Sequence, residues 1–268
     1  MSIRGVVFSL FGPLLISALF FLPSVAGAGR ADAGKSTVTV AVAANALRPV
    51  EEIARAFEES TEIEVKVVHG STGKLYAQIT QGAPFDIFLS ADRLRPSILI
   101  EKGFAGPDSG FTYARGSLAL WTNRKDLKLS ERGLDILNDE SVKKVAIANP
   151  VTAPYGTAAM EAIVASKLSG RVEAKLVFGE SVSQAFSYAR TGNVDVAITS
   201  LSTIYGQEGE SLRIDEALYP LIVQDGVVLK DAGEEADRFR EFLSSKQAVE
   251  IFSRYGYVTD ATKGNKGE

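Results

Sequence analysis

The sequence predicts an α/β fold in which strand-like and helical segments alternate along the chain. Its 268 residues are 46% hydrophobic and 23% charged, the composition of a globular protein large enough for one large core or two smaller ones. Short runs rich in Val, Ile and Ala are followed by segments whose apolar residues have helical spacing. This alternation favours mainly parallel sheets with right-handed helical crossovers.

The first part of the chain contains two strand–helix units. Residues 37–43 predict a strand, and residues 47–59 predict a helix because their apolar side chains recur on one face. A very short turn joins the two. The same pattern then repeats, with a strand, a helix and a strand predicted at 63–68, 74–81 and 85–90.

A second α/β unit begins near residue 117. Its strands are predicted over 117–122, 145–150, 174–178 and 194–200, and its helices over 156–167 and 182–190. The chain is extended again near 219–223 and closes with helices predicted over 234–243 and 245–255. The alternation allows either two tandem domains or a second unit inserted into the first.

The first 28 residues have the features of a secretory signal peptide. Arg4 precedes an apolar run over residues 6–22, and small residues follow as far as Ala28. A permanent membrane anchor is the alternative. However, Gly12-Pro13 interrupts the run, which is also short for the roughly 20 apolar residues that a span requires. We therefore predict export, with cleavage near Ala28.

The composition excludes several classes of function. The absence of cysteine excludes disulfides, thiolate metal sites and cysteine nucleophiles, and the single histidine, His69, excludes a histidine-rich metal site. With 29 basic residues against 33 acidic ones and no basic cluster, the chain is a poor candidate for binding nucleic acid. Any bound anion must be held by local dipoles.

Three predicted strand-to-helix turns carry small polar side chains: Ala44-Asn45, Gly70-Ser71-Thr72-Gly73 and Pro154-Tyr155-Gly156-Thr157. In open α/β sheets such turns lie at the carboxyl ends of strands, where ligands bind. Free N–H groups and the positive ends of helix dipoles point outward there. One such turn alone is better explained as an ordinary N-cap. Three of them in an exported chain predict capture of a small anion.

An enzyme is the alternative suggested by Ser71-Thr72-Gly73-Lys74, which matches the Ser-x-x-Lys motif of penicillin-recognising acyl enzymes. Neither Ser-Asp-Asn nor Lys-Thr-Gly follows, so acyl transfer by Ser71 and Lys74 is the less favoured hypothesis. Asp86 and Asp92, near another strand end, are predicted to brace the turn, because a carboxylate facing a bound anion would repel it.

Four segments resemble the periplasmic molybdate-binding proteins of ABC importers, within the bacterial extracellular solute-binding protein family. They read VTVAVAAN, GSTGKLYAQI, GAPFDIFLSAD and AVEIFSRYGY, and begin at Val38, Gly70, Gly82 and Ala248. The resemblance extends from about Thr37 to Val258, and the order of the segments is more specific than any single motif.

The resemblance implies a type II-like periplasmic-binding-protein fold. In this fold two α/β lobes are joined by two extended crossovers and the ligand lies between them. Residues 36–116 and 219–260 would form the first lobe, and residues 117–218 would form an inserted second lobe. Residues 1–28 would be the signal peptide, and residues 261–268 a flexible tail.

The resemblance also implies the site. By position, the residues around the anion are Asn45, Ser71, Thr72, Tyr155 and the backbone N–H of Val182, with Ala44 and Ser200 as weaker candidates. Which hydroxyl of Ser71 and Thr72 faces the ligand stays open. Some relatives have a further tyrosine where this chain has Ser200, which suggests that Tyr155 replaces that donor. The metal of the ligand would be contacted only through its oxygens, and no cofactor is expected.

The function implied is the substrate-binding component of an ABC importer. It would be a periplasmic, non-enzymatic monomer that captures molybdate or tungstate and delivers it to a permease with its ATPase. The alternatives are a binder of sulfate, phosphate or a small carboxylate, and a sensor or scaffold without a transport partner. A carboxylate normally requires an arginine fork, and the three turns contain no arginine.

Overall fold

The computed structural model describes residues 36–259. The predicted signal peptide, residues 1–28, and the predicted tail, residues 261–268, lie outside the described residues. Within residues 36–259, none of the helices combines the length and the apolar character needed to cross a bilayer.

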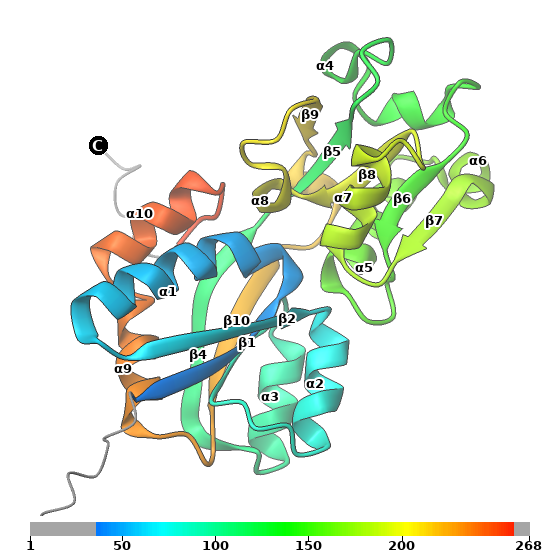
Figure 1. Cartoon of the computed structure of the whole chain (residues 1–268). Helices are drawn as coiled ribbons and strands as arrows, with labels where there is room; N and C mark the ends of the chain where they lie inside the picture. Colours follow the sequence, from blue (N-terminus) through cyan, green and yellow to red (C-terminus); the bar gives the residue numbers. More distant parts are fainter. Residues whose placement is uncertain (1–35, 260–268) are drawn as a thin grey trace, which may run out of the picture. The chain divides into compact units, whose positions relative to one another are not determined.

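The first five-stranded sheet is built from two separate parts of the chain (Figure 1). In spatial order its strands are β2 (Glu64–Gly70), β1 (Thr37–Ala43), β3 (Ile87–Leu89), β10 (Ile222–Leu229) and β4 (Ala105–Gly116). β1 runs parallel to β2 and β3, whereas β10 runs antiparallel to β3 and β4. This sheet carries the first lobe.

The second five-stranded sheet uses only the residues between these two parts. In spatial order its strands are β7 (Leu176–Gly179), β6 (Val145–Ala148), β8 (Val196–Ser200), β5 (Leu118–Thr122) and β9 (Glu210–Arg213). β6 runs parallel to β7 and β8, whereas β5 runs antiparallel to β8 and β9.

The predicted two-lobed α/β fold is confirmed, with one difference in the sheets. Mainly parallel sheets were expected, but each sheet has two parallel and two antiparallel pairings. Helical crossovers place consecutive strands in parallel. β4 and β10 are instead connected through the second lobe and not by a single helical crossover. They can therefore pair in the antiparallel orientation. The lobe limits predicted at 116/117 and 218/219 stay predictions.

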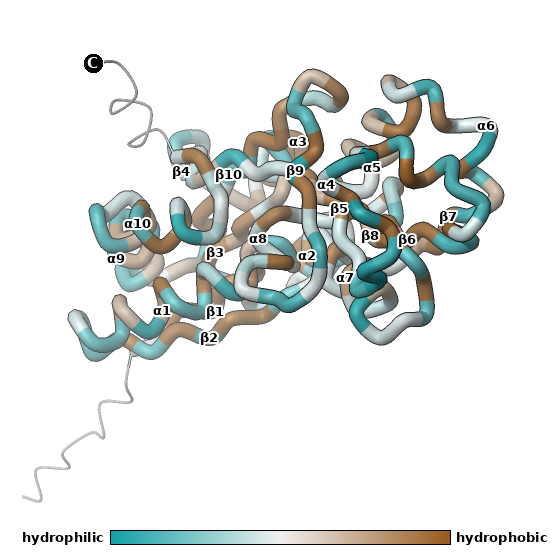
Figure 2. The backbone as a smooth tube through the Cα atoms, turned by 90° about the horizontal axis from the view of Figure 1, so that it is seen from above, coloured by the Kyte–Doolittle hydropathy of each residue, from teal (hydrophilic) through white to brown (hydrophobic). Residues whose placement is uncertain are grey.

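Helices cover both faces of the first sheet (Figure 1). α1 (Leu47–Thr61), α9 (Glu234–Phe242) and α10 (Lys246–Arg254) pack on one face, around a cluster that includes Val40, Phe57 and Phe252. α2 (Thr72–Thr80) and α3 (Leu94–Glu101) pack on the other, around Leu75 and Phe88. Figure 2 shows hydrophilic and hydrophobic stretches alternating along α1 and α10, as in helices with one buried face.

The second sheet is also covered on both faces. α5 (Pro154–Ala165) packs on one face, and α7 (Val182–Arg190) and α8 (Leu201–Ile204) pack on the other. On the α7 side Trp121 meets Phe186 edge to face, with ring centroids 4.9 Å apart. The remaining short helices are α4 (Leu129–Arg132), α6 (Ser169–Val172), η1 (Ala44–Ala46), η2 (Gly133–Asn138), η3 (Glu173–Lys175) and η4 (Glu216–Leu218).

Two crossovers join the lobes. The first is Ser117, the single residue between β4 and β5, and the second leads from η4 into β10. A hydrogen bond ties them together, because the Leu118 N–H donates to the Tyr219 hydroxyl oxygen over 3.0 Å. The two connections therefore lie side by side.

Gly156 sets how closely the start of α5 approaches the end of β6. A Cβ at this position would lie 2.8 Å from the carbonyl carbon of Ala148 and 2.9 Å from that of Asn149. Both atoms belong to the backbone and cannot rotate away. The glycine therefore allows the close contact that positions Tyr155 beside the first crossover.

We predict that Gly156→Ala lowers the free energy of unfolding by about 1–3 kcal/mol, because the added methyl overpacks against backbone. Denaturant unfolding monitored by circular dichroism measures this. Gly170→Ala in α6 is the matched control, since its Cβ has no neighbour within 4 Å. The control is expected to stay within about 0.5 kcal/mol of the wild type. Equal midpoints for the two variants would contradict the prediction.

Candidate functional site

A small pocket lies where four helices begin, two in each lobe. Its lining residues are Ala44, Asn45, Ser71, Thr72, Ala91, Ala153, Pro154, Tyr155, Ser181 and Val182. The volume open to the centre of a water molecule is about 10 Å³, close to the least that holds one water. The pocket is therefore nearly closed and suits a compact group.

No charged residue lines the pocket, so backbone dipoles are the source of any positive potential there. The elements that begin there are η1, which leads into α1, and the helices α2, α5 and α7. First-turn N–H groups of a helix have no carbonyl partner within the helix, and each helix start carries about half a positive charge. Four such starts converging on one point favour an anion.

Six of the seven residues predicted for the site line this pocket: Ala44, Asn45, Ser71, Thr72, Tyr155 and Val182. Ser200 does not. Its hydroxyl accepts from the Thr203 N–H over 3.2 Å and lies 2.6 Å from the Thr203 hydroxyl oxygen, so it caps α8.

Four lining residues were not among the predicted site residues, although Pro154 belongs to one of the three predicted turns: Ala91, Ala153, Pro154 and Ser181. Ser181 carried a usable signal, because a serine directly before a predicted helix is a typical N-cap. Its hydroxyl accepts from the Gln184 N–H over 3.3 Å. The small apolar residues carry no comparable signal.

The hydroxyls of Ser71 and Thr72 differ in their partners. The Thr72 oxygen accepts from the Ala91 N–H over 3.2 Å. Ser71 is the N-cap residue of α2, but its side chain makes no capping bond, and no partner for its hydroxyl is found within residues 36–259. Ser71 therefore has the hydroxyl that is left for the pocket.

The side chain of Asn45 donates away from the pocket. Its amide nitrogen donates to Gln224 Oε1 over 2.6 Å and to the Tyr257 hydroxyl oxygen over 2.8 Å. An amide NH₂ has two protons, and these two bonds use both. What Asn45 leaves for the pocket is its backbone N–H, in the first turn of η1.

The Tyr155 hydroxyl is held at the first crossover. Its oxygen accepts from Gln224 Nε2 over 3.1 Å, so its own proton remains available to a further acceptor. Burial raises the pKa of Tyr155 well above its ordinary value, which keeps the phenol neutral. A Cβ at Gly116 would overlap the Tyr155 oxygen, so the glycine makes room for it.

Direct hydrogen bonds between the lobes surround the pocket. The Gly73 N–H donates to the Thr152 carbonyl over 2.8 Å. The Ser183 hydroxyl donates to the Ala44 carbonyl over 3.2 Å. These contacts bring the helix starts of both lobes onto the same small volume.

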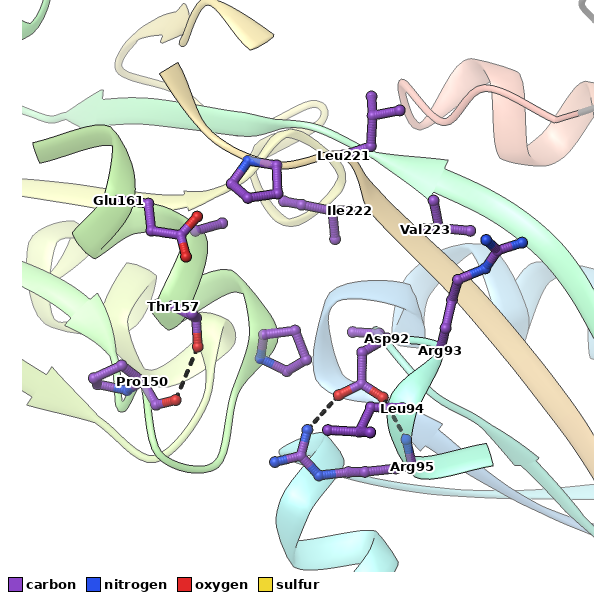
Figure 3. A pocket seen from close by; sticks show the side chains of 14 residues that line it. Asp92, Arg93, Leu94, Arg95, Pro150, Thr157, Glu161, Leu221, Ile222 and Val223 are labelled. Carbon is purple, nitrogen blue, oxygen red and sulfur yellow. Dashed lines mark hydrogen bonds and ion pairs between the residues drawn. The ribbon is translucent and has the colours of Figure 1, made fainter. Parts of the chain in front are cut away.

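A larger groove of about 500 Å³ adjoins the pocket and shares Ala91 and Pro154 with it (Figure 3). Several of its polar groups are already paired. Asp92 bonds Arg95, and the Thr157 hydroxyl donates to the Pro150 carbonyl over 2.9 Å. These polar groups of the groove already have hydrogen-bond partners within the protein and are less available to a ligand. The small pocket is therefore the better candidate site.

The two residues of the enzyme hypothesis, Ser71 and Lys74, do not share the pocket. Lys74 does not line the pocket, and its ammonium group pairs with Glu180 over 3.7 Å at the surface. His69 is an exposed residue of β2. Asp92 braces the turn before α3 as predicted, accepting from the Arg95 N–H over 3.0 Å. Asp86 does not, because it precedes β3 and accepts from the Thr39 N–H of the neighbouring strand β1.

Comparison with known proteins agrees with this geometry. A sequence profile of the family described as bacterial extracellular solute-binding protein matches residues 38–258. The molybdate-binding protein ModA of Rhodobacter capsulatus is 42% identical over 231 residues, covering 85% of this chain and 90% of that protein. ModA of Azotobacter vinelandii is 37% identical over 226 residues, covering 82% and 89%.

A solved structure matches as well. The periplasmic molybdate-binding protein of Azotobacter vinelandii aligns with a TM-score of 0.79 at 33% identity, covering 83% of this chain and 99% of that one. Fold and pocket thus define a two-lobed binding protein with its site between the lobes. The chain belongs to the bacterial extracellular solute-binding protein family, and the predicted family is confirmed.

We predict that Gly116→Ala disturbs the Tyr155 hydroxyl and lowers the free energy of unfolding by about 1–3 kcal/mol. The new Cβ would lie 2.6 Å from Gln224 Nε2 and 2.9 Å from the Tyr155 ring carbon that bears the hydroxyl. Denaturant unfolding measures the change. Gly106→Ala on the same strand is the control, because its nearest neighbour is 4.0 Å away. If both variants unfold alike, the close contact at residue 116 has no energetic role.

Proposed function

We propose that this protein captures molybdate or tungstate and delivers it to an ABC importer. The observation that carries the proposal is the convergence of four helix starts with the Ser71 and Tyr155 hydroxyls, in a pocket lined by no charged residue. The backbone N–H groups of Ala44, Asn45 and Val182 would complete the donor set. The donor set suits a tetrahedral dianion, because neutral donors come from both lobes. The lobes would separate slightly to admit it, since the pocket has room for about one water.

Physical chemistry supports an oxyanion as the ligand. A buried charge costs many kcal/mol unless almost every acceptor oxygen receives a hydrogen bond. Hydrogen bonds to charged groups are roughly twice as strong as neutral ones, so a ring of N–H and O–H donors offsets that cost. A rigid ring also discriminates by size, and molybdate and tungstate are larger than sulfate.

The relatives support the choice of ligand and the setting. Two relatives, at 42% and 37% identity, are molybdate-binding proteins. By likeness to them, this protein would act in the periplasm as a monomer and dock on a permease served by an ATPase. The ligand would favour the closed arrangement of the lobes by its higher affinity for that state.

The first test is titration calorimetry on protein that has been stripped of ligand by unfolding and refolding. We expect one-to-one binding of molybdate and tungstate, tighter than binding of sulfate or phosphate by more than about tenfold, which is ~1.4 kcal/mol. A folded sample that binds sulfate or phosphate best would transfer the proposal to that anion. A sample that binds none of the four would end the oxyanion proposal.

Val182→Pro removes one proposed donor with little change to the fold. Proline is tolerated at the first position of a helix, and the extended backbone of Ser181 (φ −146°, ψ 168°) suits a residue before proline. We expect a loss of roughly 10- to 100-fold in molybdate affinity, the strength of one hydrogen bond to a charged group.

Val182→Ala is the matched control for this variant. It shortens the same side chain but keeps the N–H, so its affinity is expected to stay near that of the wild type. Calorimetry gives the affinities, and the thermal midpoint shows that both variants are folded. Wild-type affinity in folded Val182→Pro would remove the Val182 N–H from the donor set.

A further inference from the structure

A buried polar network joins the lobes beside the pocket. Its members are Asn45, Tyr113, Gln224 and Tyr257 from the first lobe, and Tyr155 and Ser202 from the second, and each is at most 6% exposed. Only Asn45 and Tyr155 line the pocket. The other four lie behind it and determine how those two side chains are oriented.

Gln224, fully buried on β10, is the centre of this network. Its Oε1 accepts from Asn45 Nδ2 over 2.6 Å and lies 3.0 Å from the Tyr113 hydroxyl. Its Nε2 donates to the Tyr155 oxygen over 3.1 Å. One amide group therefore holds a residue of each lobe at the pocket.

The direction of these bonds has a chemical consequence. Because Gln224 donates to the Tyr155 oxygen, the phenol cannot use its proton on Gln224 and can direct it to another acceptor. A phenol that accepts one hydrogen bond is also a stronger donor in the next, because hydrogen bonds in series polarise one another. The amide thus prepares Tyr155 to donate.

Asn45 is held from two sides. Its side-chain amide makes the two bonds described above. Its backbone carbonyl accepts from the Ser202 hydroxyl over 2.8 Å and from the Tyr257 hydroxyl over 2.9 Å. Ser202 belongs to α8 of the second lobe. The turn that presents the Asn45 N–H is therefore fixed by contacts from both lobes.

We propose that Gln224 is a positioning residue for the oxyanion. By donating to Tyr155 it leaves the phenol proton for the ligand, and by accepting from the Asn45 side chain it fixes the turn whose backbone N–H faces the pocket. This rests on the function proposed above and adds a residue that does not line the pocket. Leucine at this position would leave the Tyr155 oxygen without its amide donor and the Asn45 amide with only the Tyr257 hydroxyl as acceptor. Glutamate would reverse one bond, because a carboxylate accepts the Tyr155 proton.

The reversal predicts a pH profile. Ionised Gln224→Glu would take the Tyr155 proton and repel the dianion, whereas its protonated form can donate as the amide does. The tyrosines that face position 224 are Tyr113, Tyr155 and Tyr257. Burial raises their pKa values, that of Tyr257 to about 12, so they stay neutral below pH 9.

Two carboxylates lie close to position 224 and need to be considered in the same profile. Asp225 is next on β10 and pairs with Arg93 over 3.4 Å. The second is Asp92, whose backbone carbonyl lies 3.4 Å from the Asp225 nitrogen. The Asp92 carboxylate pairs with Arg95. The wild type, Gln224→Leu and Gln224→Glu all contain both carboxylates. Any effect of their titration on affinity is therefore common to the three proteins and cancels when the pH profiles are compared.

The experiment is calorimetric titration of molybdate into the wild type, Gln224→Leu and Gln224→Glu between pH 5.5 and 8.5. We expect Gln224→Leu to lose roughly 10- to 100-fold in affinity at every pH. Gln224→Glu is expected to be weaker still at pH 8.5 and to regain about tenfold or more toward pH 5.5. The wild type is expected to change little.

A double-mutant cycle tests whether Gln224 acts through Tyr155. The double variant Gln224→Leu with Tyr155→Phe is expected to lose clearly less than the product of the two single losses, because residues in one network are not additive. Gln78→Leu is the matched control. Gln78 lies on α2, and its buried side-chain oxygen has no partner in the described part of the chain, so wild-type affinity is expected.

Each outcome decides between the proposals. Wild-type affinity in folded Gln224→Leu, or a flat pH profile in Gln224→Glu, or multiplicative losses in the cycle would overturn the role of Gln224 and leave the proposed function standing. A folded wild type that binds no molybdate would instead overturn the proposed function, and the role of Gln224 with it.

Discussion

The site depends on one geometric constraint, that a helix begins within a few residues of the end of a strand. In both lobes the parallel strands β1, β2, β6 and β7 lead into helix starts at the same edge of their sheet. Each helix start contributes unpaired N–H groups and about half a positive charge. The interlobe bonds bring the two edges together, and Gly156 lets α5 begin close enough to β6 to take part. The proposed anion-binding centre thus arises from backbone, without a cationic side chain in its lining.

Charged side chains near the pocket form ion pairs with one another and do not line the pocket. Lys74 pairs with Glu180, and Asp92 pairs with Arg95. A free cation in the pocket would attract anions of many kinds, whereas N–H and O–H donors at fixed positions favour an anion of matching size and shape. In the proposed function the lining of the pocket would therefore carry the specificity, and the surrounding charges would contribute little to affinity because they are exposed or paired.

The parts of this structure that are local in the chain could be predicted from the sequence. The strand at Thr37–Ala43 and the helix at Val182–Arg190 agree with their predicted limits, because apolar spacing is a property of neighbouring residues. α3 and β9 were not predicted, since their segments have little periodicity, and the antiparallel pairings of β10 are made over more than a hundred residues. The sequence could not choose between Ser71 and Thr72, because the choice depends on Ala91, 19 residues away from Thr72. Likewise, the orientation of Asn45 depends on Gln224, 179 residues away.

The bond between the Leu118 N–H and Tyr219 has a mechanical consequence. Two separate connections between rigid bodies allow both bending and twisting. Two connections bonded to each other at one point act as a single hinge, which bends more easily about one axis than it twists. A bond at this point would favour bending of the lobes over twisting, so that the same helix starts face each other when the lobes close. The geometry of the small pocket thereby depends in part on Tyr219, a phenol that does not itself line the pocket.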